Sequence, residues 1–517
     1  MHTHATLLAV LVGATAAAQN DYDLDKITSG RVGGPLTMQV TGAPPNQPIL
    51  WVPSTTAGPT PLNLVDPFDP RVMEVGIDLI SAAVAQLTDG AGSNTLSLSL
   101  PPNAGLSGIL LHWQTVEVLL GTPFFGELGN SVVTQIGLQN ASVAAPDALS
   151  FARAFSVAFF DRDNNAGAGD LIIAGGGTGT LTAATGLPSS ERWDFRRMSA
   201  EPAASMGTAR ALHLAVPLTD NRVLIIGGVN STGVALATCE IYDPTTNSFS
   251  PTGSMATPRT LHAACRLADG RVMVAGGTST LQPDVVAALN GTLNSCEIWN
   301  PATGTWTGTA NLGGYRLAPA LTLLPTTNQV MVSGGVAVTT FLGVPFSANS
   351  VTTVQRWNPA TGTWGSGAAM PAARAGHHYN QVTLLDGRVL MTGGVNLPNL
   401  LNATSAAPIA NADIYNPITN TWVAGNMGTA RALHGAVRLS DARVVVTGGA
   451  QGTLLAPTSI ADVHVFSPGT NTWAPAAPLL APRASHAAAL LPDNTMVLLG
   501  GQGASTTVTT IETLRFQ

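Results

Sequence analysis

The amino-acid sequence predicts an all-β protein, a seven-bladed β-propeller preceded by a small antiparallel β-sandwich. A double glycine that ends an apolar run occurs seven times between residues 175 and 501, and its second glycine recurs after 52, 49, 58, 59, 55 and 52 residues. An apolar run such as RVVVTGG leads into each pair, as expected for a buried strand. A period near ~50 residues is long enough for one four-stranded propeller blade.

Four strands are expected in each repeat unit. The first begins at an Arg-x-x-His sequence, the second runs into Gly-Gly, and the third reads like CEIYD at 239–243. A turn such as NPATG follows, in which Pro favours a type I turn and the final Gly or Asn tolerates a left-handed backbone. The fourth strand then carries an aromatic residue: Phe249, Trp306, Trp364, Trp422 or Trp473.

The last unit ends after its third strand, so another segment must supply the outer strand. An unpaired sheet edge favours aggregation, and the spacing of Val143 and Leu149 before Arg153 matches the pattern that surrounds the outer strands elsewhere. We therefore expect residues 140–144 to pair with 508–516. The predicted propeller spans 139–517, with 139–148 as closing strand and hinge.

Residues before the propeller show no repeat. Residues 19–138 contain alternating apolar runs between Pro, Gly and Asn turns, which predicts the β-sandwich. The stretch 71–87 is compatible with a helix or with two strands. Residues 1–18 resemble a secretory signal that ends in small residues at 16–18, so we expect a secreted protein, extracellular or periplasmic.

Composition excludes some classes of partner and raises the question of the cysteines. The net charge of −7 argues against nucleic-acid binding through a basic patch, and no later stretch approaches the ~18 apolar residues of a transmembrane segment. Cys239, Cys265 and Cys296 are expected to be free thiols, because equivalent strands of neighbouring blades lie too far apart for a disulfide. A disulfide or metal role is the alternative.

The combination of Arg-x-x-His, Gly-Gly and Asn-Pro-x-Thr-Gly-x-Trp resembles the kelch repeat, of the kind that forms the propeller of the galactose oxidase family. The resemblance covers residues 149–517. It implies a copper-radical site that uses a tyrosine two residues after a repeat arginine. This chain has no tyrosine there, so copper and that oxidase activity are not expected. The residues in question are Phe155, Leu212, Leu261, Ala318, Gly376, Leu433 and Ser485.

A binding surface is expected on the face that carries the connections between second and third strands. These connections are long at 278–295, 336–353 and 395–411, and they contain almost no charge. The start of each first strand lies on the same face in this topology. Candidate ligand-binding residues are Arg210, Arg259, Arg374, Arg431, Arg483, His377, His378, Tyr379, Phe341, Phe346 and Asn396.

The repeated arginines and histidines have two interpretations each. The seven arginines form either an anion-binding ring or braces between blades, and braces are favoured because a binding site rarely needs seven copies. Their expected partners are Glu191, Glu240, Glu297, Gln355, Asp413 and Glu512. The histidines three residues after the arginines are expected to brace blades, with metal ligation as the alternative. They are His213, His262, His377, His434 and His486.

One further loop offers oxygen ligands. Asp161, Asp163, Asn165 and Asp170 lie in DRDNNAGAGD and form a weak candidate for Ca²⁺, although the spacing departs from the EF-hand pattern. No other cofactor is expected.

These observations predict an exported binding or scaffold protein that recognises carbohydrate or protein through the long-loop face. The alternative is a carbohydrate-active enzyme, either a degenerate relative of galactose oxidase or a hydrolase or lyase. A cluster of two carboxylates, or of Tyr and His, on that face would favour the enzyme.

Overall fold

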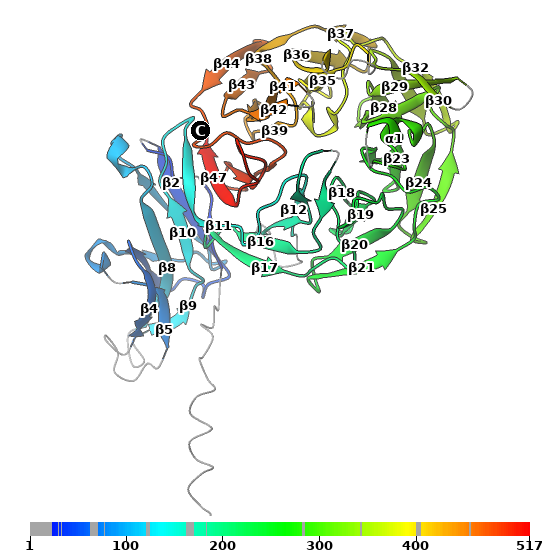
Figure 1. The fold of residues 1–517 in the computed structure, drawn as a ribbon. Coiled ribbons are helices and arrows are strands. Elements are labelled where there is room, and N and C mark those ends of the chain that lie inside the picture. The colour runs from blue at the N-terminus through cyan, green and yellow to red at the C-terminus, as the bar shows by residue number, and fades with distance from the viewer. Residues whose placement is uncertain are drawn as a thin grey trace, which may run out of the picture.

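The computed structural model describes residues 23–516 except 29, 33, 63–70, 77, 120–124, 162–169, 182, 282–284, 342–343, 400–404 and 454–455. The proposed signal at 1–18 therefore lies outside the described residues. Successive four-stranded antiparallel sheets follow one another around a ring and form a β-propeller (Figure 1). The N-terminal residues lie beside this ring, next to β11 and β47 (Figure 1).

Seven sheets of the described residues share one antiparallel plan from the inner to the outer strand. The first sheet contains β12 (Val157–Phe160), β13 (Leu171–Ala174), β16 (Ser190–Asp194) and β17 (Ser199–Ala203). The second contains β18 (Leu214–Pro217), β19 (Val223–Ile226), β20 (Cys239–Asp243) and β21 (Ser248–Thr252). The third contains β22 (Ala263–Arg266), β23 (Val272–Ala275), β24 (Cys296–Asn300) and β25 (Thr305–Thr309).

The fourth to sixth sheets repeat this plan. The fourth sheet contains β27 (Ala320–Leu324), β28 (Gln329–Ser333), β31 (Val354–Asn358) and β32 (Thr363–Ser366). The fifth contains β33 (Gln381–Thr383), β34 (Val389–Thr392), β36 (Ala407–Asn416) and β37 (Thr421–Val423). The sixth contains β39 (Gly435–Arg438), β40 (Val444–Thr447), β43 (Val463–Ser467) and β44 (Thr472–Ala476).

The seventh sheet combines the two ends of the propeller sequence. It contains β45 (Ala487–Leu490), β46 (Thr495–Leu499), β47 (Thr510–Arg515) and, as its outer strand, β11 (Ser142–Ala148). Val143 lies opposite Thr513, in the segment that the sequence assigned to closure. Closing strand and hinge, expected together at 139–148, are not separate, because Ala148 of β11 still pairs with Thr510 beyond a bulge.

Within the repeat unit, the start of the first strand differs from the sequence-based prediction and the turn before the fourth strand agrees with it. The first strand begins after the Arg-x-x-His sequence rather than at it, for example at Leu214 after His213. The turn before the fourth strand is confirmed in its left-handed final position. Asn247, Gly304, Gly362, Asn420 and Asn471 all have φ between 44° and 68°.

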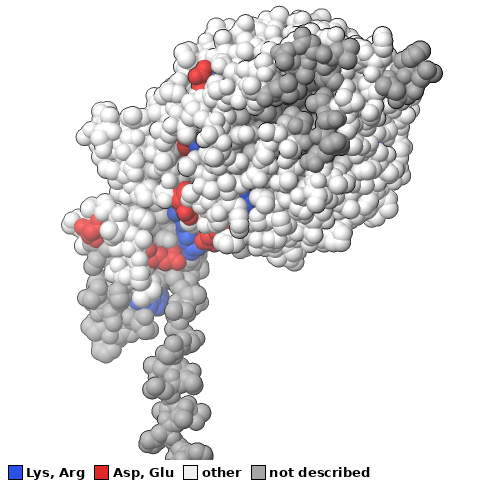
Figure 2. All heavy atoms as spheres, in the orientation of Figure 1, with Lys and Arg blue, Asp and Glu red and all other residues white. Residues whose placement is uncertain are grey.

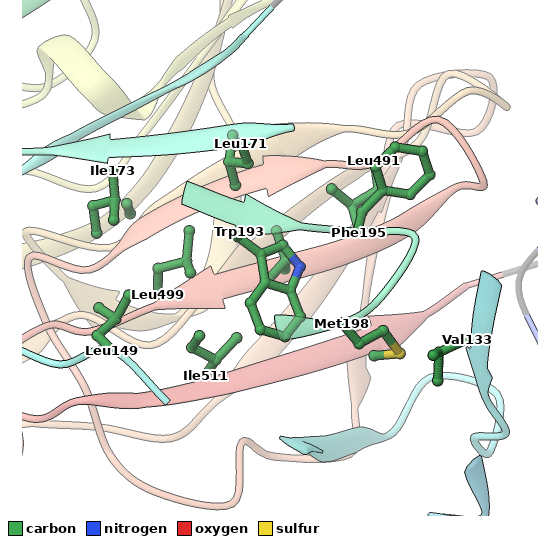
Figure 3. Packing of buried hydrophobic residues seen from close by; sticks show 12 residues of the cluster. Val133, Leu149, Leu171, Ile173, Trp193, Phe195, Met198, Leu491, Leu499 and Ile511 are labelled. Carbon is green, nitrogen blue, oxygen red and sulfur yellow. The ribbon is translucent and has the colours of Figure 1, made fainter. Parts of the chain in front are cut away.

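Apolar second strands form the core between neighbouring sheets. The cluster in Figure 3 joins the last sheet, through Leu499 and Ile511, to the first sheet, through Leu171, Ile173 and Trp193. Leu149, which follows β11, belongs to the same cluster. Burial at this junction therefore stabilises the contact between the N-terminal and C-terminal sheets of the ring.

Two antiparallel sheets precede the propeller and share a second core. One contains β1 (Asp23–Lys26), β2 (Pro35–Thr41) and β7 (Asn94–Ser99); the other contains β10 (Val132–Gln135), β8 (Leu110–Val118), β3 (Pro48–Ser54) and β6 (Val84–Leu87), with β9 (Phe125–Leu128) paired to β8. Leu36, Met38 and Val40 of β2 alternate inward and cluster with Trp51 and Trp113 of the second sheet. The ambiguous stretch 71–87 forms β5 (Val72–Val75) and β6 around a 3₁₀ turn.

Candidate functional site

Each repeat arginine is buried and bonded within its own sheet. Arg210 has no exposed surface, and its Nη1 donates to the carbonyl oxygens of Gly227 at 2.9 Å and Thr238 at 2.8 Å. Its Nη2 donates to Glu240 Oε1 at 3.0 Å. The guanidinium thus bonds the first glycine, the third-strand carboxylate and the residue two before it. Arg153, Arg259, Arg374 and Arg483 have the same three kinds of partner.

The backbone of each arginine, in contrast, bonds to the preceding sheet. The carbonyl oxygen of Arg210 accepts from Gly176, and that of Arg259 accepts from Gly228, both at 2.9 Å. The series continues through every sheet and ends with Gly501, which donates to Arg153 at 2.8 Å. The expected inter-blade brace is therefore made by the arginine main chain, whereas the side chain stabilises its own sheet.

Two arginines lack the carboxylate. Gln355, the expected partner of Arg316, instead accepts from the backbone nitrogen of Gly313 at 3.2 Å. Arg431 Nη2 lies 2.9 Å from His464 Nδ1 and 4.0 Å from Asp462, whose side chain is 49% exposed. Burial without a close carboxylate lowers the pKa of both Arg316 and Arg431 to about 10.

This placement corrects the assignment of the arginines to a binding rim. Arg210, Arg259, Arg374, Arg431 and Arg483 have no exposed surface, and their guanidinium groups are bonded inside the sheets. A ligand on the surface cannot reach these charges without disrupting a sheet. These five arginines therefore present no exposed positive charge that could bind an anion.

The repeat histidines lie between sheets. His377, His434 and His486 place Nε2 at 3.1, 2.8 and 3.0 Å from the hydroxyl groups of Ser333, Thr392 and Thr447, which precede Gly-Gly in the preceding sheet. Burial lowers the pKa of His486 to about 3, and it holds the pKa of His377 and His434 well below the usual value. These imidazoles are neutral braces, as expected.

Two histidines of the same series lack such a hydroxyl. For His262 the equivalent residue of the preceding sheet is Ile226, and for His213 it is Ala174. Both nitrogens of the His262 ring are buried without a hydrogen-bond partner. Burial lowers the pKa of His213 to about 3 and that of His262 well below its usual value, so both rings remain neutral.

A cavity of about 250 Å³ occupies the centre of the ring, at the start of the first strands. It is lined by all seven residues that stand two after the repeat arginines, and each has a left-handed backbone with φ between 49° and 66°. They are Phe155, Leu212, Leu261, Ala318, Gly376, Leu433 and Ser485. The left-handed turn directs these side chains out of the strand and into the space that the sheets enclose.

A single 3₁₀ turn, His378–Asn380, adds polar groups to this cavity. The Tyr379 hydroxyl donates to the carbonyl oxygen of His213 in the second sheet at 2.9 Å, so the side chain links the fifth sheet to the second. The Tyr379 side chain is in edge contact with the ring of His378, with 5.4 Å between centroids. The residue is 58% exposed although it lies within the ring.

His378 is held in one tautomer. Its Nδ1 accepts from the backbone nitrogen of Leu321 at 3.3 Å, and burial lowers its pKa to about 4. A neutral ring whose Nδ1 accepts must carry its proton on Nε2, which makes Nε2 a donor. The sequence predicted a strand that begins at the Arg-x-x-His sequence, here 374–377, and it did not predict the turn that follows His377.

The long connections carry additional secondary structure. Helix α1 (Val285–Asn290) lies in 278–295, the hairpin β29 (Val336–Phe341) and β30 (Val344–Ser350) fills 336–353, and β35 (Val395–Asn396) begins 395–411. Phe346 is 70% exposed on β30, and Asn396 is half-buried on β35. Phe341 ends β29, and its side chain lies outside the described residues.

These connections pack around the cavity entrance. Leu281 and Ala288, from the connection that holds α1, cluster with Phe155 and Ala211 beside the first strands. Leu212, Leu261 and Leu433 pack against the same cluster. The long-loop face and the cavity therefore meet, as the topology predicted.

An arginine side chain contacts two of the carboxylates of the candidate calcium-binding loop. Arg192 Nη2 lies 2.6 Å from Asp161 and its Nη1 lies 3.6 Å from Asp170. Asp163 and Asn165 lie outside the described residues. Within the described ranges, no group of three or more His, Cys, Asp or Glu side chains is arranged to hold a metal ion.

The copper site that the resemblance to the galactose oxidase family implies would need a tyrosine at one of the left-handed positions of the cavity. No tyrosine stands at the seven left-handed positions, and the repeat histidine nitrogens face neighbouring sheets, where three of the five bond Ser or Thr hydroxyls. Burial raises the pKa of Cys239 to about 11 and that of Cys265 and Cys296 to about 12, so all three remain protonated thiols. The donor set does not fit copper.

Several charged residues lie at the junction between the N-terminal sheets and the propeller. Figure 2 shows acidic and basic side chains gathered there, and Asp25 pairs with Arg196 at 2.8 Å. Lys26, the only lysine, is buried; its Nζ donates to the carbonyl oxygen of Val133 at 3.0 Å and lies 4.0 Å from Asp493. The sequence did not predict this contact, because its partners lie more than 100 residues away.

None of the helices in the described residues has the length and apolar character needed to cross a membrane. Residues 210–256 match a family model described as the Kelch motif. Kelch-like protein terF of Aspergillus terreus (strain NIH 2624 / FGSC A1156) is 29% identical over 182 residues. The match covers 34% of this chain, and the chain spans 37% of the length of that relative.

A solved structure is similar over a larger part of the chain. It is described as a novel fungal alcohol oxidase with catalytic diversity among the AA5 family, in complex with copper. The alignment has a TM-score of 0.51 and 16% identity, and it covers 72% of this chain and 75% of that one. At this identity the likeness shows the fold alone.

Proposed function

We propose that this chain, a kelch-repeat β-propeller that resembles the propeller of the galactose oxidase family, is an exported binding or scaffold protein. It recognises a carbohydrate or a protein through the long-loop face. Kelch repeats support a binding role. The observation that carries the proposal is the addition of α1 and the β29–β30 hairpin to connections between second and third strands, beside the central cavity.

In this proposal the surface that the partner presents to the long-loop face is uncharged. The arginines nearest to the face are buried and bonded within their sheets, so they offer no charge to an acidic glycan. Phe346 is 70% exposed, and Val234 and Val286 are 59% and 57% exposed on the neighbouring connections. Aromatic and aliphatic surfaces of this kind contact the apolar faces of neutral sugars or the side chains of a protein.

The architecture in this proposal is a closed propeller of seven blades at 139–517, preceded by a β-sandwich at 19–138. The seven sheets that share one antiparallel plan and the bond from Gly501 to Arg153 support the closed ring. The core shared by the two N-terminal sheets supports the sandwich. Export rests on the resemblance of 1–18 to a secretory signal.

A glycan array with neutral and acidic glycans, together with affinity capture of extracellular proteins, tests this function. Phe346→Ala should weaken binding about tenfold, since an exposed aromatic at the centre of a contact is worth at least ~1.4 kcal/mol. Leu385→Ala is the matched control, because Leu385 is 68% exposed in the connection between first and second strands, on the opposite face. Equal effects of the two substitutions, or preferred binding of acidic glycans, would contradict the proposal.

The enzyme alternative has one observation in its favour, the contact of Tyr379 with His378 inside the cavity. A tyrosine hydroxyl and a neutral imidazole are groups that transfer protons in catalysis. If the chain is a hydrolase, lyase or oxidase of carbohydrates, turnover of a carbohydrate panel should be detectable and Tyr379→Phe should abolish it. Binding without turnover would favour the binding module.

A further inference from the structure

We propose that the central cavity is a separate binding site for one small, uncharged organic molecule with an apolar body and a single hydrogen-bond acceptor, such as an aromatic alcohol or ketone. This site is distinct from the outer surface of the long-loop face, so it does not depend on the function proposed above. The proposal rests on the walls of the cavity, its polar groups and its lack of charge.

The walls leave space and are mostly apolar. Phe155, Leu212, Leu261 and Leu433 line one end of the cavity. The first strands contribute small side chains, where larger ones would fill the centre of the ring. These are Ala158, Ala215, Ala436, Ala487 and Ala488. The volume of about 250 Å³ lies just below the ~300–1,000 Å³ range of ligand pockets, which limits the site to a small molecule.

One donor is fixed at this cavity. His378 Nδ1 accepts from Leu321, so Nε2 presents its proton, and no bond from Nε2 to the described residues is made. The Tyr379 hydroxyl already donates its proton to the carbonyl oxygen of His213, so the Tyr379 oxygen remains a hydrogen-bond acceptor. A ligand oxygen that accepts from His378 would therefore satisfy a donor that the protein leaves open.

The cavity offers no counter-charge. The lining contains no Asp, Glu, Lys or Arg. Its histidines have a lowered pKa and are neutral near pH 7. A carboxylate or an ammonium group placed there would lose its hydration without gaining a partner. Neutral ligands are therefore preferred over charged ligands of the same shape.

The first test uses probes of similar size with the full chain. Benzyl alcohol and acetophenone are compared with toluene, benzoate and benzylammonium by saturation-transfer NMR and calorimetry. Both neutral oxygen-bearing probes should bind at least about tenfold more tightly than the two ions, as expected from the cost of burying an unpaired charge. Equal or tighter binding of benzoate, or no binding of any neutral probe at millimolar concentration, would overturn the proposal.

The second test locates the probe with substitutions that the repeat itself suggests. Ala318→Phe introduces the side chain that Phe155 already carries at the equivalent left-handed position, with φ of 49° and 56°. It should fill the cavity and abolish binding of benzyl alcohol, while an unchanged melting temperature shows that the fold is intact. Unaltered affinity in this variant would place the probe elsewhere and overturn the proposal.

A matched pair at His378 tests the donor. In His378→Asn the side-chain oxygen can replace Nδ1 as acceptor for Leu321, but the donor at Nε2 is lost; in His378→Gln an amide nitrogen reaches the place of Nε2. The Asn variant should weaken acetophenone about tenfold and leave toluene unchanged, and the Gln variant should retain more of the acetophenone affinity. A parallel loss of both probes would indicate a merely structural role and contradict the assigned donor.

Discussion

The carbonyl oxygen of Arg153 accepts a hydrogen bond of 2.8 Å from the backbone nitrogen of Gly501. Arg153 lies just before the first strand of the first sheet, and Gly501 lies just after the second strand of the seventh sheet. Each earlier sheet makes the equivalent bond to the next arginine along the chain. The bond between Arg153 and Gly501 therefore joins the first sheet to the seventh in the same way as neighbouring sheets are joined.

The arginine side chains should contribute to stability in proportion to what their removal leaves unpaired. Arg210→Ala leaves Glu240 buried, although Gly207 still donates to it, and should lower the free energy of unfolding by about 3–5 kcal/mol. Arg431→Ala leaves mainly carbonyl oxygens and should cost about 1–3 kcal/mol. Equilibrium unfolding in urea measures both.

Arg222→Ala is the control for these two variants. Arg222 pairs with Asp220 at 2.7 Å on the surface, and such pairs contribute about 0–1 kcal/mol. If Arg210→Ala is no more destabilised than Arg222→Ala, the buried bonds do not stabilise the sheet. Loss of affinity for acidic glycans without loss of stability would restore the anion-ring interpretation.

Removal of β11 should prevent the last sheet from forming correctly. A chain that begins at residue 150 lacks the partner of β47 and exposes an apolar edge, so it should aggregate, whereas a chain that begins at 130 keeps β11 and should stay soluble. Size-exclusion chromatography and circular dichroism compare the two. Similar behaviour of both truncations would show that β11 is dispensable.

His262 should gain stability from a hydroxyl group in the preceding sheet. Ile226→Thr supplies the partner that Thr392 gives to His434, and Ile226→Val is the isosteric control without the hydroxyl. The Thr variant should be more stable than the Val variant by about 0.5–1.5 kcal/mol. A buried hydroxyl without a partner has the opposite effect, so a less stable Thr variant would contradict the assigned geometry.

The buried histidines predict a loss of stability in acid. In the unfolded chain histidines take up protons near pH 6.5, whereas in the folded chain burial lowers the pKa of His378 to about 4 and that of His213 and His486 to about 3. The unfolded state therefore binds more protons below pH 6.5, and stability falls as pH decreases through this window. Each histidine contributes up to about 1.4 kcal/mol per pH unit.

Unfolding in urea at pH 7, 6 and 5 measures this slope, and His486→Gln should reduce it by about one proton. Asp170 acts in the opposite direction. Burial, together with Asp194, raises its pKa to about 7, so its ionisation lowers stability as pH rises from about 4 to 7. Asp170→Asn should therefore steepen the loss in acid. Constant stability between pH 7 and 5 in both variants would contradict these assignments.

Calcium should leave the melting temperature unchanged. The guanidinium group of Arg192 contacts both Asp161 and Asp170, and a cation would have to displace it. In Arg192→Gln the two carboxylates lose their counter-charge, and millimolar Ca²⁺ should then raise the melting temperature. A rise in the unsubstituted protein would show that the loop binds Ca²⁺ despite Arg192.

The repeat made the order of the strands predictable because local patterns repeat with the fold. Val143 and Leu149 mark the outer strand of the last sheet with the same apolar spacing that other units show, so the pairing with 508–516 could be predicted from sequence distance alone. The Gly or Asn at the end of each turn was predictable for a steric reason, since few other residues adopt a positive φ.

The candidate site was less predictable because it depends on side-chain direction. The burial of Arg431 follows from bonds to Gly448 and Asp462 that spacing does not indicate. Tyr379 enters the cavity because a 3₁₀ turn replaces the expected start of the first strand, and a strand pattern cannot anticipate that turn. Glycine marks only one of the seven left-handed positions of the cavity, Gly376, whereas residues such as Leu212 and Phe155 occupy the others.

The burial of Lys26 has a consequence for the chemistry of the surface. Since the chain contains no other lysine, the described residues present their positive charge to solvent as guanidinium groups and never as a primary amine. Reagents that acylate amines would find their side-chain target only after the junction between the N-terminal sheets and the propeller had opened. Modification of Lys26 would thus report the separation of those two parts of the molecule.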